Sequence, residues 1–297
     1  MLVAVDSKRS IGAPGLHAPF PEVGFQTHMG LGRHANEDAG WMAPNTFNWD
    51  RAGRLMAVAD GMGGHKGGGF ASRYACTAVA DYYHNMPRRC SCREPAELCR
   101  RLTDIIYRVD RGLRLIAGKT RKLSDMGTTL ACLVLTPVQS IIGHVGDSRI
   151  YRWRRGRLCC LTTDHTFVQE MIAEGEIDPQ AADHHPLRHL LTQAVGTAEP
   201  LEHVFARVDP IWPGDRFLLC TDGLHNAVPS AQISDIMGQD ADAGTTASNL
   251  IQQALDNRTR DNVTVLVARV AGACEGCPAA TEESCDDNII LKSDSGK

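Results

Sequence analysis

The sequence predicts an α+β fold built on antiparallel sheets. Its apolar segments are of two kinds, short runs of strand length such as residues 55–59, and longer stretches with helical spacing such as residues 95–117. The two kinds are grouped along the chain rather than alternating strictly, which favours α+β over a doubly wound parallel sheet. The sequence contains no internal repeat and no clear linker. We therefore expect one catalytic domain of about residues 22–271.

The elements can be placed in order from their apolar patterns and turn residues. Strands are predicted from Val23 and over residues 55–59, 129–136, 140–145, 149–155, 202–208, 216–221 and 263–270. Helices are predicted over residues 67–86, 95–117, 164–176, 187–196, 229–238 and 245–258. Two local signals refine this picture. Gly146-Asp147-Ser148 is typical of a tight hairpin turn, and Asp164 is a plausible N-cap for the helix that follows it.

Composition and charge narrow the classes of function. The chain has 297 residues, 43% of them hydrophobic, which is enough for a sizeable core. A net charge of −4 and a pI of about 6.3 argue against binding to nucleic acid or to an anionic membrane. No apolar run approaches the length of a membrane span, and the N-terminus lacks the features of a signal peptide. We expect a cytoplasmic, soluble monomer.

The two ends of the chain differ from its middle. Residues 1–21 carry glycine and proline without periodicity and predict an N-terminal extension. Residues 272–297 are polar and acidic and predict a disordered tail. The chain has eleven cysteines, and an odd number without a secretory signal argues against a disulfide framework. A single Cys274-x-x-Cys277 pair, with Cys285 beyond it, is only a weak indication of zinc binding or redox chemistry.

The stretch Leu55–Gly64, LMAVADGMGG, carries the clearest chemical signal. A short apolar strand ends at Asp60, and Gly61 follows at once with further glycines behind it. A carboxylate beside an accessible backbone carbonyl is a site of hard oxygen ligands, which Mg²⁺ and Mn²⁺ prefer. A strand followed by a glycine turn with a capping aspartate is the simpler interpretation of this stretch alone.

Further carboxylates lie at the margins of predicted strands. Asp222 follows one strand, Asp261 precedes another, and Glu37-Asp38 follows a glycine-containing loop. If these acids share one end of a sheet, their mutual repulsion raises their pKa values unless cations compensate. Two divalent ions would remove this penalty, with Asp60 as the most plausible bridge, and would activate a water for in-line attack on a phosphoryl group. Arg33 would supply a fixed cation that grips two phosphate oxygens.

Eight ordered stretches resemble a known family. The chain is similar to the type 2C metal-dependent serine/threonine protein phosphatases, the PPM family, in their compact bacterial form. The resemblance covers residues 22 to 270. The matching stretches are GLGRHANEDA, VADGMGGHKGG, DMGTTL, GHVGDSRIYRWRRG, LTTDHTFVQEMIAEGEI, HPLRHLLTQAVG, GDRFLLCTDGLHN and RDNVTVLV.

The resemblance implies a fold and a set of roles. The implied fold is a four-layer αββα sandwich, with two packed antiparallel sheets flanked by helices and a mobile flap at about residues 165–196. Asp60 would bridge two Mn²⁺ or Mg²⁺ ions and Asp38 would orient the nucleophilic water. Arg33 would bind the substrate phosphate. The remaining implied metal ligands are Glu37 through a water, the Gly61 carbonyl, Asp222 and Asp261, with Asp125 and Asp222 for a possible third ion.

The resemblance also leaves alternatives open. Some relatives carry a histidine directly after the Asp-Gly pair to protonate the leaving alcohol, but here that residue is Met62, and a structural role suits His65 better. The leading hypothesis is a phosphatase that acts on phosphoserine and phosphothreonine in proteins and opposes a bacterial Ser/Thr protein kinase. The alternatives are a catalytically impaired regulator that binds phosphoproteins and a phosphatase of other phosphoesters.

Overall fold

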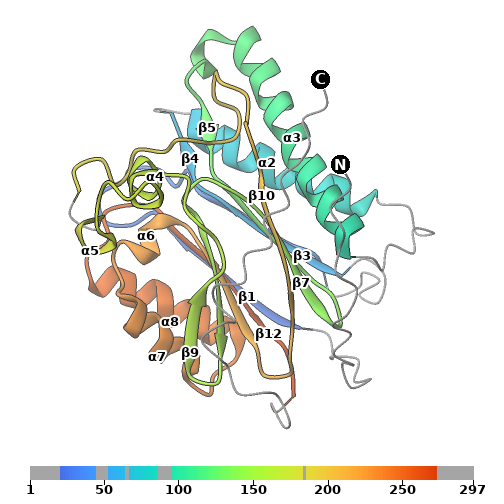
Figure 1. Ribbon diagram of the computed structural model, residues 1–297, viewed down its shortest axis with the longest axis vertical. Helices are drawn as coiled ribbons and strands as arrows, with labels where there is room; N and C mark the ends of the chain where they lie inside the picture. The colour runs from blue at the N-terminus through green and yellow to red at the C-terminus, as the bar shows by residue number, and fades with distance from the viewer. Residues whose placement is uncertain (1–20, 45–52, 64–66, 86–94, 183–184, 273–297) are drawn as a thin grey trace.

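The protein has four layers, two five-stranded antiparallel sheets packed face to face with helices on both outer sides (Figure 1). The computed structural model describes residues 21–44, 53–63, 67–85, 95–182 and 185–272. The predicted extension and tail, His65 and the Cys274-x-x-Cys277 pair lie outside these residues, apart from the ends of the two terminal segments. The predicted α+β class is therefore confirmed, and so is the sandwich that the family resemblance implied.

The first sheet is covered by the C-terminal helices. Its strands, in spatial order, are β1 (Glu22–His28), β12 (Val263–Arg269), β11 (Arg216–Cys220), β8 (Arg149–Arg154) and β9 (Arg157–Cys160). Its outer face packs against α7 (Ser230–Gly238) and α8 (Ala243–Asp256), and the short α6 (Asp222–His225) follows β11 directly. Leu218 and Val265 belong to the core between this sheet and its helices.

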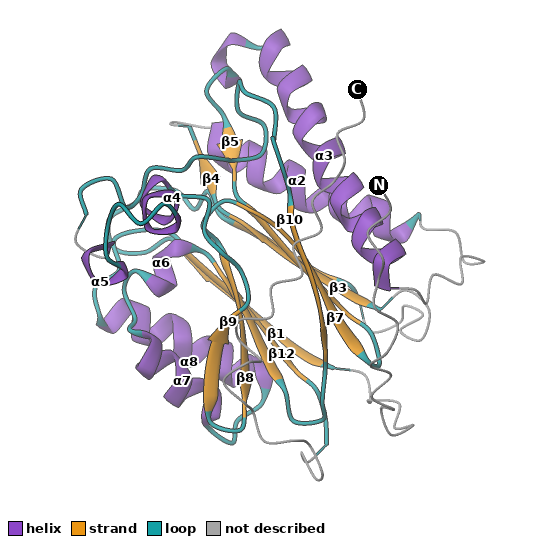
Figure 2. Cartoon of the chain, in the orientation of Figure 1, coloured by secondary structure: helices purple, strands orange, loops and turns teal. Residues whose placement is uncertain are grey.

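The second sheet is covered by the N-terminal helices, as Figure 2 shows. Its strands, in spatial order, are β10 (Phe205–Pro210), β7 (Gln139–Val145), β6 (Leu130–Leu135), β3 (Arg54–Ala59) and β2 (Ala39–Met42). Its outer face packs against α2 (Gly67–His84) and α3 (Pro95–Lys119). Within the described ranges, no helix is both long and apolar enough to cross a membrane.

The remaining described elements are small and surround one end of the sandwich. β4 (Gly61–Met62) and β5 (Gly127–Thr128) form a two-stranded ribbon, and the 3₁₀ helix η1 (Arg121–Leu123) joins α3 to β5. The segment implied to be a flap carries α4 (Phe167–Ala173) and α5 (Pro179–Ala182).

The position of strand β3, between the helices and the other sheet, explains why no polar residue occurs between Leu55 and Ala59. Leu55 and Ala57 face the helices α2 and α3, whereas Met56 and Val58 face the other sheet. A strand that is buried on both faces needs apolar residues at every position and shows no alternation. The prediction of a buried strand that ends at Asp60 is therefore confirmed.

Gly146-Asp147-Ser148 does not close a hairpin, contrary to the prediction. β7 pairs with β6 and β10, whereas β8 pairs with β11 and β9, so this turn crosses from one sheet to the other. Gly146 has a φ of +104°, and a Cβ there would lie 2.6 Å from Thr129 Cγ2. The turn residues were correctly recognised, but pairing partners are set by non-local contacts that turn chemistry does not encode.

The flap segment differs from the prediction in two places. Helix α4 begins at Phe167 with Thr166 as its N-cap, because Asp164 instead forms a bidentate ion pair with Arg149 at 2.8–3.1 Å. The helix predicted over 187–196 is absent from this part of the described chain, which forms turns and isolated bridges. One of these bridges ties Val195 to Thr128.

The described cysteines are mostly free thiols inside the fold. Those that are free are Cys76, Cys99, Cys132, Cys160 and Cys220. Cys159 is disulfide-bonded, so the sequence argument against disulfides does not hold at that position.

Three histidine rings connect the space between the sheets to the base of the flap. His144 on β7 is fully buried, its ring lies 5.1 Å from that of His165, and the His165 ring lies 5.3 Å from that of His203. Among the described residues, neither ring nitrogen of His144 has a hydrogen-bond partner. Burial lowers the pKa of His144 to about 4, because a charged ring would lose its hydration there.

We expect His144 to make the fold less stable in mild acid. The unfolded chain takes up a proton at this ring near pH 6.5 and the folded chain only near pH 4, so the free energy of unfolding falls as the pH drops between these values. The full loss is about 3 kcal/mol. His144→Leu should flatten this dependence in urea unfolding at pH 7.5, 6 and 5, whereas the control His34→Leu, at an exposed position, should not. Parallel curves for the wild type and His144→Leu would contradict the assignment.

Candidate active site

The acids singled out in the sequence meet at one end of the sandwich. Asp60 follows β3 in one sheet, whereas Asp222 follows β11 and Asp261 precedes β12 in the other. β11 and β12 are antiparallel neighbours, so the end of one lies beside the start of the other. Electrostatic interactions link Asp60 with both Asp222 and Asp261 across the two sheets.

The backbone around Asp60 is fixed by two threonines. The Asp60 N–H donates to Thr129 Oγ1 at 2.8 Å, and the Asp60 carbonyl accepts from Thr128 Oγ1 at 2.8 Å and from the Thr129 N–H at 2.9 Å. The carboxylate lies among other acids. Its pKa is raised well above the ordinary value, first by burial and then by Asp38 and Asp222.

Asp38, which precedes β2 of the second sheet, is held in the same cluster by the hydroxyl of Thr221, which follows β11 of the first sheet. Its Oδ2 accepts a hydrogen bond of 2.9 Å from Thr221 Oγ1, while its Oδ1 is buried without a partner. Burial is the main cause that raises the pKa of Asp38 to about 7, with Asp222 and Asp261 adding to it. Asp38 is therefore a carboxyl group with one oxygen fixed and the other available.

Asp222 is placed at the first residue of α6. Its Oδ2 accepts a hydrogen bond of 3.0 Å from Asn226 Nδ2, and its Oδ1 is buried without a partner. Burial raises its pKa, and the neighbouring Asp261 raises it further. Asp38 and Asp222 thus each leave one carboxylate oxygen unsatisfied, which is unusual for buried polar atoms.

Arg33 lies at the rim of the cluster and pairs with Asp261. Its Nε and Nη2 donate to the two carboxylate oxygens at 2.7 Å each, in the bidentate geometry that suits a guanidinium and a carboxylate. The pair is partly exposed, with 55% of the Arg33 side chain accessible. The Asp261 hydrogen bond raises the pKa of Arg33, and Asp60 and Asp222 raise it further.

Asn262 holds the loop that carries these residues. Its Nδ2 donates to the carbonyls of Met29 and Ala35 at 2.9 Å, and its Oδ1 accepts the Glu37 N–H at 2.8 Å. One buried amide therefore positions both sides of the Arg33 loop. Sequence reasoning assigned Asn262 no role, and its place directly after Asp261 was the only signal available.

Three predicted residues occupy the edges of the site. Glu37 is half-buried, with its backbone bound to Asn262. Gly61 lies in β4, where a Cβ would come within 2.3 Å of the Gly68 carbonyl oxygen. Asp125 is exposed, and its carbonyl packs against Gly63.

The donor set fits a hard divalent cation, although the side chains do not form a finished cage. In the described ranges, no group of three or more His, Cys, Asp or Glu side chains is arranged to hold a metal ion as it stands. The chemistry nevertheless suits Mn²⁺ or Mg²⁺: several carboxylates repel one another, and Asp38 and Asp222 each have an unpartnered oxygen. A cation would relieve both penalties.

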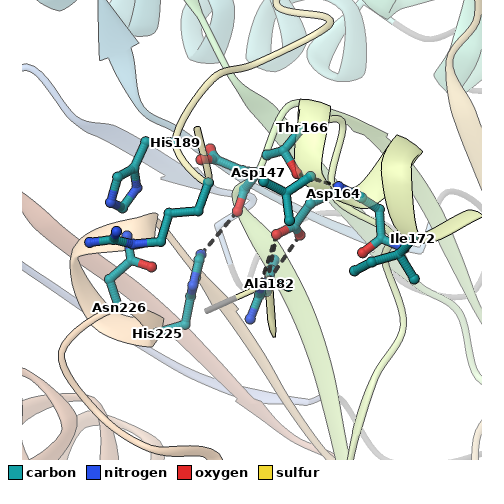
Figure 3. Close-up of a pocket in the computed structure, with 12 residues that line it drawn as sticks. Asp147, Asp164, Thr166, Ile172, Ala182, His189, His225 and Asn226 are labelled. Carbon is teal, nitrogen blue, oxygen red and sulfur yellow. Dashed lines mark hydrogen bonds and ion pairs between the residues drawn. The ribbon is translucent and has the colours of Figure 1, made fainter. Parts of the chain in front are cut away.

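Asp147 lies next to this cluster, which the sequence did not indicate. Its carboxyl group is buried, and its pKa is raised well above the ordinary value by burial and by Asp222. Its carbonyl accepts a hydrogen bond of 3.0 Å from His225 Nε2. Figure 3 shows both residues in a cavity of about 80 Å³ between α6 and the flap, which contributes His189.

The protein family was identified by comparing the chain with models of known families. The family model described as "Protein phosphatase 2C" matches residues 35–257. The chain belongs to the protein phosphatase 2C family. The identification made from the sequence motifs is therefore confirmed, and with it the class of enzyme, a protein phosphatase.

Individual relatives agree with this family assignment. The serine/threonine phosphatase stp of Listeria welshimeri is 35% identical over 243 residues, which cover 82% of this chain and 93% of that protein. The crystal structure of the Mycobacterium tuberculosis phosphatase PstP/Ppp matches with a TM-score of 0.74 and 32% identity, over 85% of this chain and 99% of that one. A structure of the PstP catalytic domain in complex with two manganese ions matches with a TM-score of 0.72 and 31% identity, over 85% and 99% of the two chains.

We expect Asn262→Asp to loosen the Arg33 loop. The new carboxylate can still accept the Glu37 N–H but would face the Met29 and Ala35 carbonyls without donors, which should cost about 2–4 kcal/mol of stability. Urea unfolding measures this loss, and the control is Asn249→Asp on α8, a half-buried position whose amide donates to Gln239 at 3.5 Å. Equal stability of the two variants would show that the clamp contributes little.

Proposed function

We propose that this protein phosphatase hydrolyses phosphoserine and phosphothreonine in proteins, using Mn²⁺ or Mg²⁺ held at the end of the sandwich. The observation that carries the proposal is the group of carboxylates formed by the buried Asp38 and the half-buried Asp60 and Asp222, beside the Arg33–Asp261 pair. The relatives named as serine/threonine phosphatases support the same substrate class.

Asp60, Asp222 and Asp261 are the residues we assign to the metal ions, with the Gly61 carbonyl and Glu37 through a water. When bound, the ions offset the charge of these carboxylates and supply Lewis-acid activation of water and phosphate. Asp125 and Asp222 are the residues we assign to a third ion. Asp222 suits these roles because its Oδ1 has no partner among the described residues.

Asp38 would orient the attacking water. Its Oδ2 is engaged by Thr221, so the free Oδ1 is the atom that can accept a hydrogen bond from that water. The leaving-group acid remains unassigned, because Met62 has no proton to donate.

Arg33 would bind the substrate phosphate. Its Nε and Nη2 are held by Asp261, while Nη1 has no hydrogen-bond partner in the described part of the chain. The Asp261 pair therefore fixes the direction of the guanidinium and leaves an amino group for a phosphate oxygen. In this proposal the substrate binds at the rim, with its phosphoryl group directed toward Asp38 and Asp60.

The physiological substrates that this proposal implies are phosphorylated proteins. A serine/threonine protein kinase and its targets are the partners we infer, because a phosphatase of this class reverses their phosphorylation. We further propose that the protein acts as a monomer.

Asp60→Asn should abolish metal-dependent turnover. The amide cannot supply the negative charge that two cations need, so kcat for a phosphothreonine peptide with Mn²⁺ should fall on the order of 1,000-fold. EDTA should have the same effect on the wild type. The control is Asp256→Asn at the exposed end of α8, which should leave kcat unchanged.

Calorimetric titration with Mn²⁺ separates the alternatives to this function. A wild-type protein that binds no Mn²⁺ would be a catalytically impaired regulator. A protein that binds Mn²⁺ and hydrolyses phosphotyrosine peptides or small phosphoesters, but no phosphothreonine peptide, would be a phosphatase of another substrate class.

Arg33→Ala should weaken phosphate binding. Loss of the guanidinium should lower kcat/KM for the phosphothreonine peptide by about 100-fold, and inhibition by inorganic phosphate should weaken in parallel. The neighbouring exposed Arg260→Ala serves as the matched control. Unchanged phosphate inhibition in Arg33→Ala would assign Arg33 to holding Asp261 alone.

A further inference from the structure

The C-terminal half of α3 carries an exposed row of basic side chains. Arg108, Arg111 and Lys119 recur at helical spacing on one face, with Leu115 between them. Arg121 and Lys122 extend the row into η1, and all of these basic residues are exposed. We call this row, with Leu115, the α3 basic stripe.

The charges of the stripe are not neutralised within the fold. In the N-terminal half of α3, Arg100 pairs with Glu97 and Asp104, and Arg101 also pairs with Glu97. Farther along, Arg114 pairs with Asp110. None of the basic residues of the stripe has an ion-pair partner in the described part of the chain. The result is a local excess of positive charge on a protein whose net charge is −4.

The stripe leads to the active site. Figure 1 shows the C-terminal end of α3 rising beside β5 and β4, at the end of the sandwich where Asp60 lies. Lys122 is three residues before Asp125, whose carbonyl packs against Gly63 of the Asp60 loop. The flap helices α4 and α5 lie away from α3 (Figure 1), and only the end of the flap segment reaches this helix, where Gly196 donates to the buried Asp110 rather than to the exposed stripe.

Leu115 adds an apolar element to this charged surface. Its side chain is 60% exposed, although the other large apolar residues of α3 are mostly buried. Long aliphatic stems of arginine and lysine flank it and can cover apolar groups of a partner. The surface therefore suits a segment that combines acidic residues with an apolar one.

We propose that the α3 basic stripe docks an acidic segment of the phosphoprotein substrate, beside the phosphorylated residue. This inference rests on the proposed function and deepens it. Positive charge that approaches a catalytic site steers and retains an anionic substrate, and the contacts are sensitive to salt. From Arg108 to Lys119 the helix rises about 16 Å, which matches about five residues of extended chain.

A protein substrate explains the stripe better than a nucleic acid or a membrane does. The charge is confined to one helical face and η1, whereas the chain as a whole is acidic and would be repelled by an extended anionic surface. The stripe also ends next to Asp125, so a bound segment would continue directly into the site. Vesicle and nucleic-acid binding are therefore outcomes that would count against the proposal.

The test compares three phosphothreonine peptides of equal length. Two of them carry a run of Asp and Glu with one Leu that starts about three residues from the phosphothreonine, on its N-terminal side in one peptide and on its C-terminal side in the other. The third peptide carries Ser and Gly at both places. The wild type should show a KM about tenfold lower for an acidic peptide at low salt, and 0.5 M NaCl should remove the difference. Equal KM values for all peptides at low salt would overturn the proposal.

The variant Arg108→Glu/Arg111→Glu/Lys119→Glu should raise KM for the acidic peptide at least about tenfold and leave kcat unchanged. Turnover of p-nitrophenyl phosphate, which cannot reach the stripe, should also be unchanged. Loss of that activity as well would indicate damage to the site or the fold, and no activity in the wild type would refute the proposed function instead. Leu115→Ser should raise KM for the acidic peptide only.

Arg111→Glu and Arg157→Glu form the matched pair of single charge reversals. Both residues are exposed, but Arg157 lies at the β8–β9 turn, away from the active-site end. The proposal requires a change in KM for Arg111→Glu alone. Equal changes in KM for the two variants would show that only the overall charge of the protein matters, and would contradict a docking role of the stripe. Binding of the wild type to phosphatidylserine vesicles, without any preference for the acidic peptide, would assign the stripe to a membrane and overturn the proposal.

Discussion

The repulsion between buried carboxylates at the end of the sandwich is the constraint on which this structure depends. Burial and neighbouring charges raise the pKa values of Asp38, Asp60 and Asp222 together. The groups that hold Asp38 and Asp222, Thr221 and Asn226, are neutral. Neutral donors fix the positions of the acids without cancelling their charge, so the compensation is left to cations.

The site also depends on the packing of the two sheets. Asp60 comes from one sheet, and Asp222 and Asp261 come from the other, so the carboxylates approach each other only when the sandwich is closed. The core between the sheets, with Met56 on one side and Leu266 on the other, sets their separation. Because such interiors are close-packed, a change of volume in this core would be transmitted to the site.

The sequence predicted this site better than it predicted the connections around it. Asp60, Asp222 and Asp261 could be located because each stands at the margin of an apolar strand, which is a local signal. The pairing of β8 with β11, and the role of Asp164, depend on residues in other elements: Arg149 on β8 takes the carboxylate that was expected to cap α4. Thr221 and Asn262 were missed for the same reason, since an isolated threonine or asparagine shows its role only through its partners.

The negative charge of the carboxylate cluster explains why positive charge is needed around it. A cluster of carboxylates repels a phosphate dianion until cations are present, so the approach of substrate must be favoured from outside the cluster. Under the proposed function, Arg33 would meet this need at the shortest range, where its bond to Asp261 fixes the direction of the guanidinium. The α3 basic stripe, as proposed, would act in the same way at longer range, because its charges have no ion-pair partner among the described residues and begin three residues from Asp125. Because the chain as a whole carries a net charge of −4, a basic surface near the active site differs in charge from most of the molecule. An anionic substrate would therefore be attracted mainly to the active-site end.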